Sequence, residues 1–125
     1  MITAKRAYEP AVPSDGYRVL IDRLWPRGVS KAKARLDAWE KGISPSRELR
    51  EWYGHDRAKW PEFRARYTKE LRTAAAKKIL ADLLRRARRG RVTLVYGSRD
   101  AEISDVAVLR GMLSRHAGKK HARPE

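Results

Sequence analysis

Continuous apolar runs mark the stretches of this chain that are predicted to form strands. Residues 17–24 and 92–96 each contain such a run, bordered by glycine or by charged residues. A short, nearly continuous apolar run is typical of a strand that is covered on both faces. A further strand is predicted over residues 2–8, ahead of a loop at 10–16 that holds two prolines and a glycine, and a brief extended piece is predicted over 37–39.

Helical spacing accounts for most of the other apolar residues. Trp60, Phe63, Tyr67 and Leu71 recur at intervals of three and four, which predicts one buried stripe on a helix. The predicted helices run, in chain order, from a cap at Ser30 to Leu36, from Ser44-Pro45 to Gly54, from a cap at Asp56 through the Trp60 stripe, over residues 74–89, and from Ser104 or Asp105 to His116.

Strands that alternate with helices predict an α/β fold, with a small, mainly parallel sheet of three or four strands and helices packed on it. The length of 125 residues fits one domain, which we place at residues 1–117. Residues 118–125 are basic and have nothing to bury, which predicts a disordered tail. Because the sheet is narrow, the helices must supply much of the core.

The composition limits the compartment and the chemistry. The chain has no cysteine, so disulfides and cysteine-based metal sites are excluded, and its histidines lack the spacing of a metal site. The first residues lack the apolar core of a signal peptide, and no apolar run approaches the length of a membrane span. We therefore expect a cytoplasmic protein without a metal or a membrane partner. Cofactors, catalysis and oligomeric state are left open.

The charge is the least ordinary property. The chain has 30 lysines and arginines against 15 acidic residues, a formal net charge of +15. Such a surface attracts polyanions, so non-specific nucleic-acid binding at low salt is expected. The absence of a standard nucleic-acid motif favours the alternative, a cationic surface without a specific partner. The densest basic run consists of Arg85, Arg86, Arg88, Arg89 and Arg91, which would bind phosphates in the first case and face solvent at a helix end in the second.

The most unusual stretch is Arg23-Leu24-Trp25-Pro26-Arg27-Gly28, at the end of the second predicted strand. Pro26 disfavours helix at Trp25 and Gly28 permits a positive φ, so the stretch is a shaped turn. Ligands of open α/β sheets lie at the carboxyl ends of strands, and guanidinium groups bind phosphate and carboxylate through paired hydrogen bonds. The sequence therefore predicts a small anionic ligand, phosphate or carboxylate, bound by Arg23, Trp25, Arg27, Ser98, Arg99 and Asp100.

Alternative interpretations of these residues stay open. Asp22, Asp100 and Asp105 would neutralise the arginines if internal ion pairs hold the turns, and Asp100 would otherwise orient an arginine or act as the carboxylate of the site. His55-Asp56 is interpreted as a helix end and a cap rather than a general base and its orienting group. Ser98 has no obvious histidine partner and no glycine-rich phosphate loop occurs, so a hydrolase triad and a nucleotide loop are unsupported.

Several motifs occur together along the chain. They are Arg23-Leu24-Trp25-Pro26-Arg27-Gly28, Trp39-x-Lys41, Ser44-Pro45-Ser46, Leu49-Arg50-x-Trp52-Tyr53-x-His55-Asp56, Trp60-x-x-Phe63-x-x-x-Tyr67-x-x-Glu70-Leu71 and Thr93-Leu94-Val95-Tyr96-x-x-Arg99-Asp100. In these motifs and their order the chain resembles the YeaO-like proteins, small bacterial proteins with a domain of unknown function, over residues 2–115. The resemblance implies a fold and little chemistry, because the family has no agreed activity. Many relatives carry a His-Asn pair where this chain has Ile103-Ser104-Asp105.

Overall fold

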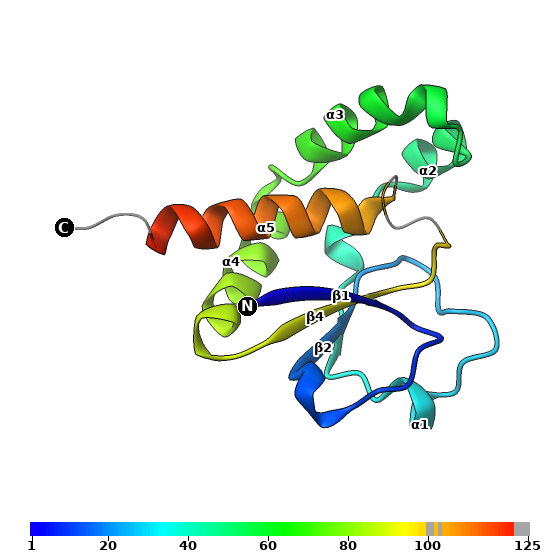
Figure 1. Ribbon diagram of the computed structural model, residues 1–125. Coiled ribbons are helices and arrows are strands. Elements are labelled where there is room, and N and C mark those ends of the chain that lie inside the picture. The colour runs from blue at the N-terminus through cyan, green and yellow to red at the C-terminus, as the bar shows by residue number, and fades with distance from the viewer. Residues whose placement is uncertain (100–101, 103, 122–125) are drawn as a thin grey trace.

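The computed structural model of the protein describes residues 1–99, 102 and 104–121, with side chains described as far as residue 115. Its centre is a parallel sheet of four strands in the order β1-β4-β2-β3 (Figure 1). These are β1 (Ile2–Arg6), β4 (Val92–Tyr96), β2 (Tyr17–Leu20) and β3 (Ala38–Trp39). The predicted α/β fold with a small parallel sheet is therefore confirmed.

All residues of β4 are buried, as the continuous apolar run predicts for a strand in the middle of the sheet. Val92 and Leu94 point to the same face as Val19 of β2, and this face carries the main core. Val95 points to the other face, where it packs with Leu20 in a smaller cluster. Successive side chains of a strand alternate between faces, so a single strand serves both clusters.

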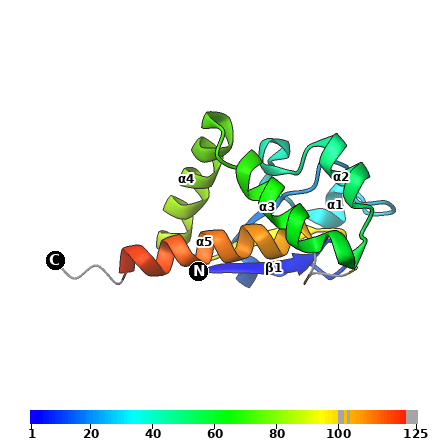
Figure 2. The ribbon, with the colours of Figure 1, turned by 90° about the horizontal axis from the view of Figure 1, so that it is seen from above.

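Five α-helices are present in the described part of the chain. They are α1 (Lys31–Ala34), α2 (Arg47–Tyr53), α3 (Trp60–Glu70), α4 (Ala74–Arg89) and α5 (Asp105–His121). Helices α2 to α5 lie on the main-core face, α5 runs alongside β1, and the segment with α1 lies on the opposite face (Figures 1 and 2). None of the described helices is both long and apolar enough to span a bilayer.

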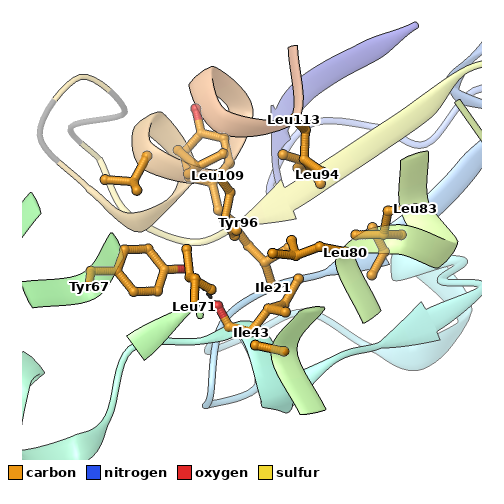
Figure 3. Close-up of a cluster of buried hydrophobic side chains, with 14 of the residues drawn as sticks. Ile21, Ile43, Tyr67, Leu71, Leu80, Leu83, Leu94, Tyr96, Leu109 and Leu113 are labelled. Carbon is orange, nitrogen blue, oxygen red and sulfur yellow. Dashed lines mark hydrogen bonds between the residues drawn. The ribbon is translucent and has the colours of Figure 1, made fainter. Parts of the chain in front are cut away.

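The main core joins the two longest helices to the sheet. Leu80 and Leu83 of α4 and Leu109 and Leu113 of α5 gather around Leu94 (Figure 3). The aromatic stripe of α3 completes the core, because Phe63 and Tyr67 are 2% and 0% exposed. The Tyr67 hydroxyl donates to the Ile43 carbonyl oxygen at 2.5 Å, so its polar atom is satisfied inside the core.

Trp60 departs from the predicted stripe because it is only half-buried. It is the first residue of α3, where the chain leaves a 3₁₀ turn at Arg57–Lys59. One side of its ring packs on Phe63, with ring centroids 5.8 Å apart, while the rest lies at the surface. The helical spacing correctly placed Trp60 on the face of α3 that packs on the core. Its position at the end of the helix makes it less buried than Phe63 and Tyr67.

Several predicted boundaries also differ. Strand β1 ends at Arg6 instead of residue 8, and α1 ends at Ala34 instead of Leu36. Strand β2 ends at Leu20 instead of residue 24, because the Asp22 carboxylate, rather than the backbone, accepts the Gly97 N–H at 2.8 Å. Helix α2 is capped by Ser46, whose hydroxyl accepts from the Leu49 N–H at 3.1 Å, instead of by Ser44. Helix α5 continues past His116 and Gly118 to His121, and residues 122–125 lie outside the described residues.

A buried ionic cluster holds the loop between β1 and β2. Asp15 is 6% exposed and Arg18 is 3% exposed, and the Arg18 Nη1 lies 2.8 Å from the Asp15 Oδ2. Lys5 adds its Nζ at 3.1 Å from the Asp15 Oδ1. Burial opposes ionisation of Asp15, but hydrogen bonds from the Val12 N–H, Lys5 and Arg18 outweigh it and lower the pKa of the carboxyl.

Candidate functional site

A cleft of about 460 Å³ lies at the carboxyl ends of the strands. Its walls come from Tyr8 after β1, residues 22–26 after β2, residues of α2 and the turn that follows it, Phe63 of α3, and residues 97, 98, 104 and 105 between β4 and α5. In a parallel sheet all carboxyl ends share one edge, so loops that are far apart in sequence meet there. The cleft is the place where the sequence predicted a site.

Part of the predicted ligand-binding set lines this cleft. Arg23, Trp25 and Ser98 are in its walls. Arg27 and Arg99 are exposed and are not in the described lining. The prediction for Asp100 lies outside the described residues.

The turn after β2 explains why Arg23 and Arg27 separate. The Val29 N–H donates to the Pro26 carbonyl at 3.3 Å, and Gly28 has a φ of 81°, which places Arg27 in the exposed part of a tight turn. The Trp25 ring is fixed on the inner side, because its Nε1 donates to the Val29 carbonyl at 2.5 Å. It also packs edge-on against Trp39, with ring centroids 5.5 Å apart. Trp25 is thus a rigid, half-buried wall of the cleft.

Arg50 is a cleft residue that the sequence reasoning missed. It projects from α2, and its Nε is buried without a hydrogen-bond partner in the described part of the chain. Its guanidinium group makes no ion pair within 4.0 Å among the described residues, although its charge partly opposes the rise that burial causes in the pKa of Asp22. The only sequence signal was its place in the Leu49-Arg50-x-Trp52-Tyr53 motif.

Arg23 is also free of carboxylate partners in the part of the chain that the structure describes. Its Nε donates to the Pro45 carbonyl oxygen at 3.5 Å, a long hydrogen bond to a neutral group. Among the described side chains, neither Asp22 nor Asp105 therefore forms an ion pair with Arg23. The cleft therefore holds two guanidinium groups, those of Arg23 and Arg50, that form no ion pair with a described carboxylate.

Asp22 and Asp105 instead pair with each other. Their carboxyl groups share a hydrogen bond, which requires a proton on one of them. Asp22 also accepts from the Gly97 N–H at 2.8 Å, and Asp105 accepts from the Val106 N–H at 2.9 Å. Burial raises the pKa of both carboxyl groups, and the charge of Asp22 raises that of Asp105 further. The pair therefore retains a proton to higher pH than free aspartates do.

Two further positions test the sequence interpretation. His55 lies at the rim with a left-handed φ of 58°, and its ring centroid is 5.9 Å from that of Tyr53. Asp56 accepts from the Ala58 N–H at 3.0 Å and caps the following turn, as expected. Ser104 and Asp105 line the cleft, whereas Ile103 lies outside the described residues. No group of three or more metal-ligating side chains occurs among the described residues.

The basic run occupies the opposite end of the sheet, because it immediately precedes β4. Arg85 and Arg86 pair with Asp82 at 2.7 and 2.9 Å, and the Arg86 guanidinium lies over the Tyr17 ring at 4.0 Å. A shallow groove of about 550 Å³ passes between these side chains, Arg89 and Arg91. Arg88, Arg89 and Arg91 are exposed. This groove is separate from the cleft at the carboxyl ends.

Comparison with known proteins places the chain among its relatives. All of residues 1–125 match the family described as the inactive DUF488-N3 subclade. The chain is 42% identical over 113 residues to the uncharacterized protein Rv3073c of Mycobacterium tuberculosis, covering 90% of this chain and 93% of the relative. It is 41% identical over 113 residues to the uncharacterized protein YeaO of Escherichia coli, covering 90% of this chain and 96% of YeaO.

No solved structure gives a significant match. The two relatives and the family match agree with the family resemblance proposed from the sequence, and each relative is covered over nearly its whole length. Cleft residues such as Trp25, Arg50 and Tyr53 stand in those motifs. The chain therefore belongs to the YeaO-like proteins, a family with a domain of unknown function, within the inactive DUF488-N3 subclade.

Proposed function

We propose that the protein binds a small anionic ligand, a phosphate or a carboxylate, in the cleft at the carboxyl ends of its strands. The observation that carries the proposal is the Arg50 guanidinium group, whose buried Nε has no partner among the described residues. A buried charged donor without a partner is costly, so such a group is expected to meet an acceptor in the working state of the protein. An anion in the cleft supplies that acceptor.

Arg23 and Ser98 support the same proposal from the loops after β2 and β4. Among the described residues Arg23 donates to one backbone carbonyl, at 3.5 Å, so its other N–H groups are available to a ligand. Trp25 forms a rigid wall beside them. The description of the family as inactive favours ligand binding over catalysis for this cleft.

Calorimetric titration with inorganic phosphate and with benzoate tests the proposal. Arg50→Gln should weaken binding of the anion at least about tenfold, the loss expected for one charge-assisted contact of about 1.4 kcal/mol or more. Arg50→Lys should restore little of it, because the planar fork is absent. Arg89→Gln, which makes the same change of charge at the other end of the sheet, should leave the affinity unchanged. Equal affinities for wild type and Arg50→Gln would refute the proposal.

A second candidate is weak, sequence-independent binding of nucleic acid by the basic groove. Its supporting observation is that Arg86 stacks on Tyr17 beside Arg89 and Arg91, which combines an aromatic ring with cations. Affinity for a short single-stranded DNA should fall steeply between low and moderate salt. Arg89→Gln should weaken it and Arg50→Gln should not, the reverse of the pattern for the small anion. Sequence preference, or binding that persists at high salt, would contradict this mode.

A further inference from the structure

The cleft holds acceptors as well as cations. Asp22 and Asp105 line it together with Arg50, yet no ion pair within 4.0 Å joins these groups in the described part of the chain. A protein with a net charge of +15 has many cations with which to neutralise an acidic pair. In this cleft the Arg50 guanidinium group and the two carboxyl groups instead remain without such an ion pair. A ligand that carries only an anionic group would leave the carboxyl pair unused.

We propose that the ligand is dipolar and planar, with an anionic group held by Arg50 and Arg23 and an N–H donor group held by Asp22 and Asp105. This inference rests on the proposed function and names the ligand class for the same cleft. Amidines, guanidines and the donor edges of nucleobases share this chemistry, because each presents adjacent N–H groups that match the oxygens of carboxyl groups.

The carboxyl pair has acceptor capacity that the protein leaves open. Asp22 accepts from the Gly97 N–H and Asp105 from the Val106 N–H, and the two carboxyl groups share one hydrogen bond. Two carboxyl groups together offer more lone pairs than these contacts use. Because the backbone donors fix both side chains at the ends of β4 and α5, the open acceptors are held in place before a ligand arrives.

The remaining walls fit a flat ring. Trp25, Tyr53 and Phe63 give the cleft an aromatic lining, and Tyr8 is 49% exposed at its rim. Leu24 also lines the cleft and is 63% exposed, although the protein has a buried core to receive such a side chain. Exposed apolar and aromatic side chains around polar groups are typical of sites for ring-bearing ligands. The volume of about 460 Å³ lies in the range of such sites.

Three matched probes separate the two halves of the inference. Benzoate carries only the anionic group, benzamidine carries only the N–H donors, and 4-amidinobenzoate carries both on one ring. We expect 4-amidinobenzoate to bind the full-length protein at least about tenfold more tightly than benzoate, the gain from one further charge-assisted contact. Benzoate binding without this gain would overturn the dipolar inference and leave the proposed function standing. Failure of all three probes, and of inorganic phosphate, to bind would overturn both.

Variants assign the gain to the named residues. Asp105→Asn keeps an acceptor for the Val106 N–H and places a donor amide against the probe, so it should reduce 4-amidinobenzoate to the affinity of benzoate. The quantity compared is the ratio of the two affinities within each protein, so a change in benzoate binding itself is divided out. An undiminished gain in Asp105→Asn and also in Asp22→Asn, with both variants folded by circular dichroism, would overturn the assignment.

Natural sources of the same chemistry are distinguished by a second titration. Guanosine 5′-monophosphate presents an N–H and amino edge with a phosphate, whereas inosine 5′-monophosphate lacks the amino group. Tighter binding of the guanine nucleotide identifies a nucleobase edge as the donor. Equal binding of the two nucleotides, with the gain for 4-amidinobenzoate intact, identifies an amidine-like or guanidine-like acid instead. Both results support the dipolar class, and the absence of the amidine gain excludes it.

Discussion

Replacing Asp105 with asparagine is expected to stabilise the protein at neutral pH and to flatten the pH dependence of its stability. Burial raises the pKa of Asp105 well above 3.8, and Asp22 raises it further. The unfolded chain releases the Asp105 proton near pH 3.8, and the folded state releases it only near its own, higher pKa. Between these two pH values the folded state holds a proton that the unfolded chain has lost. The free energy of unfolding therefore falls as the pH rises through that range.

The magnitude follows from one proton. A difference of one bound proton changes the free energy of unfolding by about 1.4 kcal/mol per pH unit. The wild type loses this contribution from pH 3.8 upward until the pH reaches the folded-state pKa, and above that pKa the loss is constant. Asparagine has no proton to lose, and its side-chain oxygen still accepts from the Val106 N–H. The stability of the variant relative to wild type should therefore increase with pH.

Urea unfolding followed by tryptophan fluorescence, at intervals between about pH 4 and pH 8, measures this difference. Subtraction removes the contribution of titrating groups that do not contact residue 105, whereas Asp22 loses its carboxyl partner in the variant and is part of the measured difference. Asp105→Ala provides the matched control, since it also removes the slope but leaves the Val106 N–H without its acceptor and should be less stable than Asp105→Asn at every pH. A wild-type-minus-asparagine difference that is constant with pH would refute the reasoning.

Other predictions concern the fold. Tyr67→Phe should lower the free energy of unfolding by about 1–3 kcal/mol, because the buried Ile43 carbonyl loses its donor; no change in urea midpoint would contradict this. Asp15→Ala should cost about 3–5 kcal/mol by leaving Arg18 buried and unpaired. Because the pKa of Asp15 is lowered, its contribution is present above pH 3.8 and is lost below it, so wild type and variant should converge in acid unfolding. Ser46→Ala should cost about 0.5–2 kcal/mol through loss of the α2 cap, and an unchanged thermal midpoint would exclude that role.

Much of the fold was predictable because it depends on local patterns. The apolar run of β4 and the caps at Ser30 and Asp56 are features of neighbouring residues, and the structure has them as predicted. The end of β2 was not predictable, because it depends on Asp22 binding Gly97 from another loop. The cap of α2 moved from Ser44 to Ser46 for a similar reason, since Ser46 also binds Glu70 of α3 through its backbone and its hydroxyl.

The cleft lies at the edge of the sheet that the strand ends indicated, and its lining was less predictable. Arg23, Trp25 and Ser98 of the predicted set line it, and Arg27 and Arg99 are not in its described lining. Arg50 came from a helix that sequence patterns assigned to packing alone. The Asp22–Asp105 pair joins residues that are 83 positions apart (105 − 22), and only the pairing of β2 with β4 brings them together. Sequence periodicity contains no signal for such a contact.

The strand order also constrains when this protein folds. The middle strand of the sheet, β4, is the last strand in the sequence, and β1 and β2 each pair with it rather than with each other. While the chain is still emerging from the ribosome, β1 has no strand partner and β2 has only the two-residue strand β3 until residues 92–96 are available. Sheet formation must therefore wait for nearly the whole chain and for contacts of high sequence separation, which slow folding. Nascent chains that stop before β4 leave β1 unpaired and one edge of β2, with its apolar residues Val19 and Leu20, uncovered, and these are the species in which chaperone binding and aggregation should concentrate.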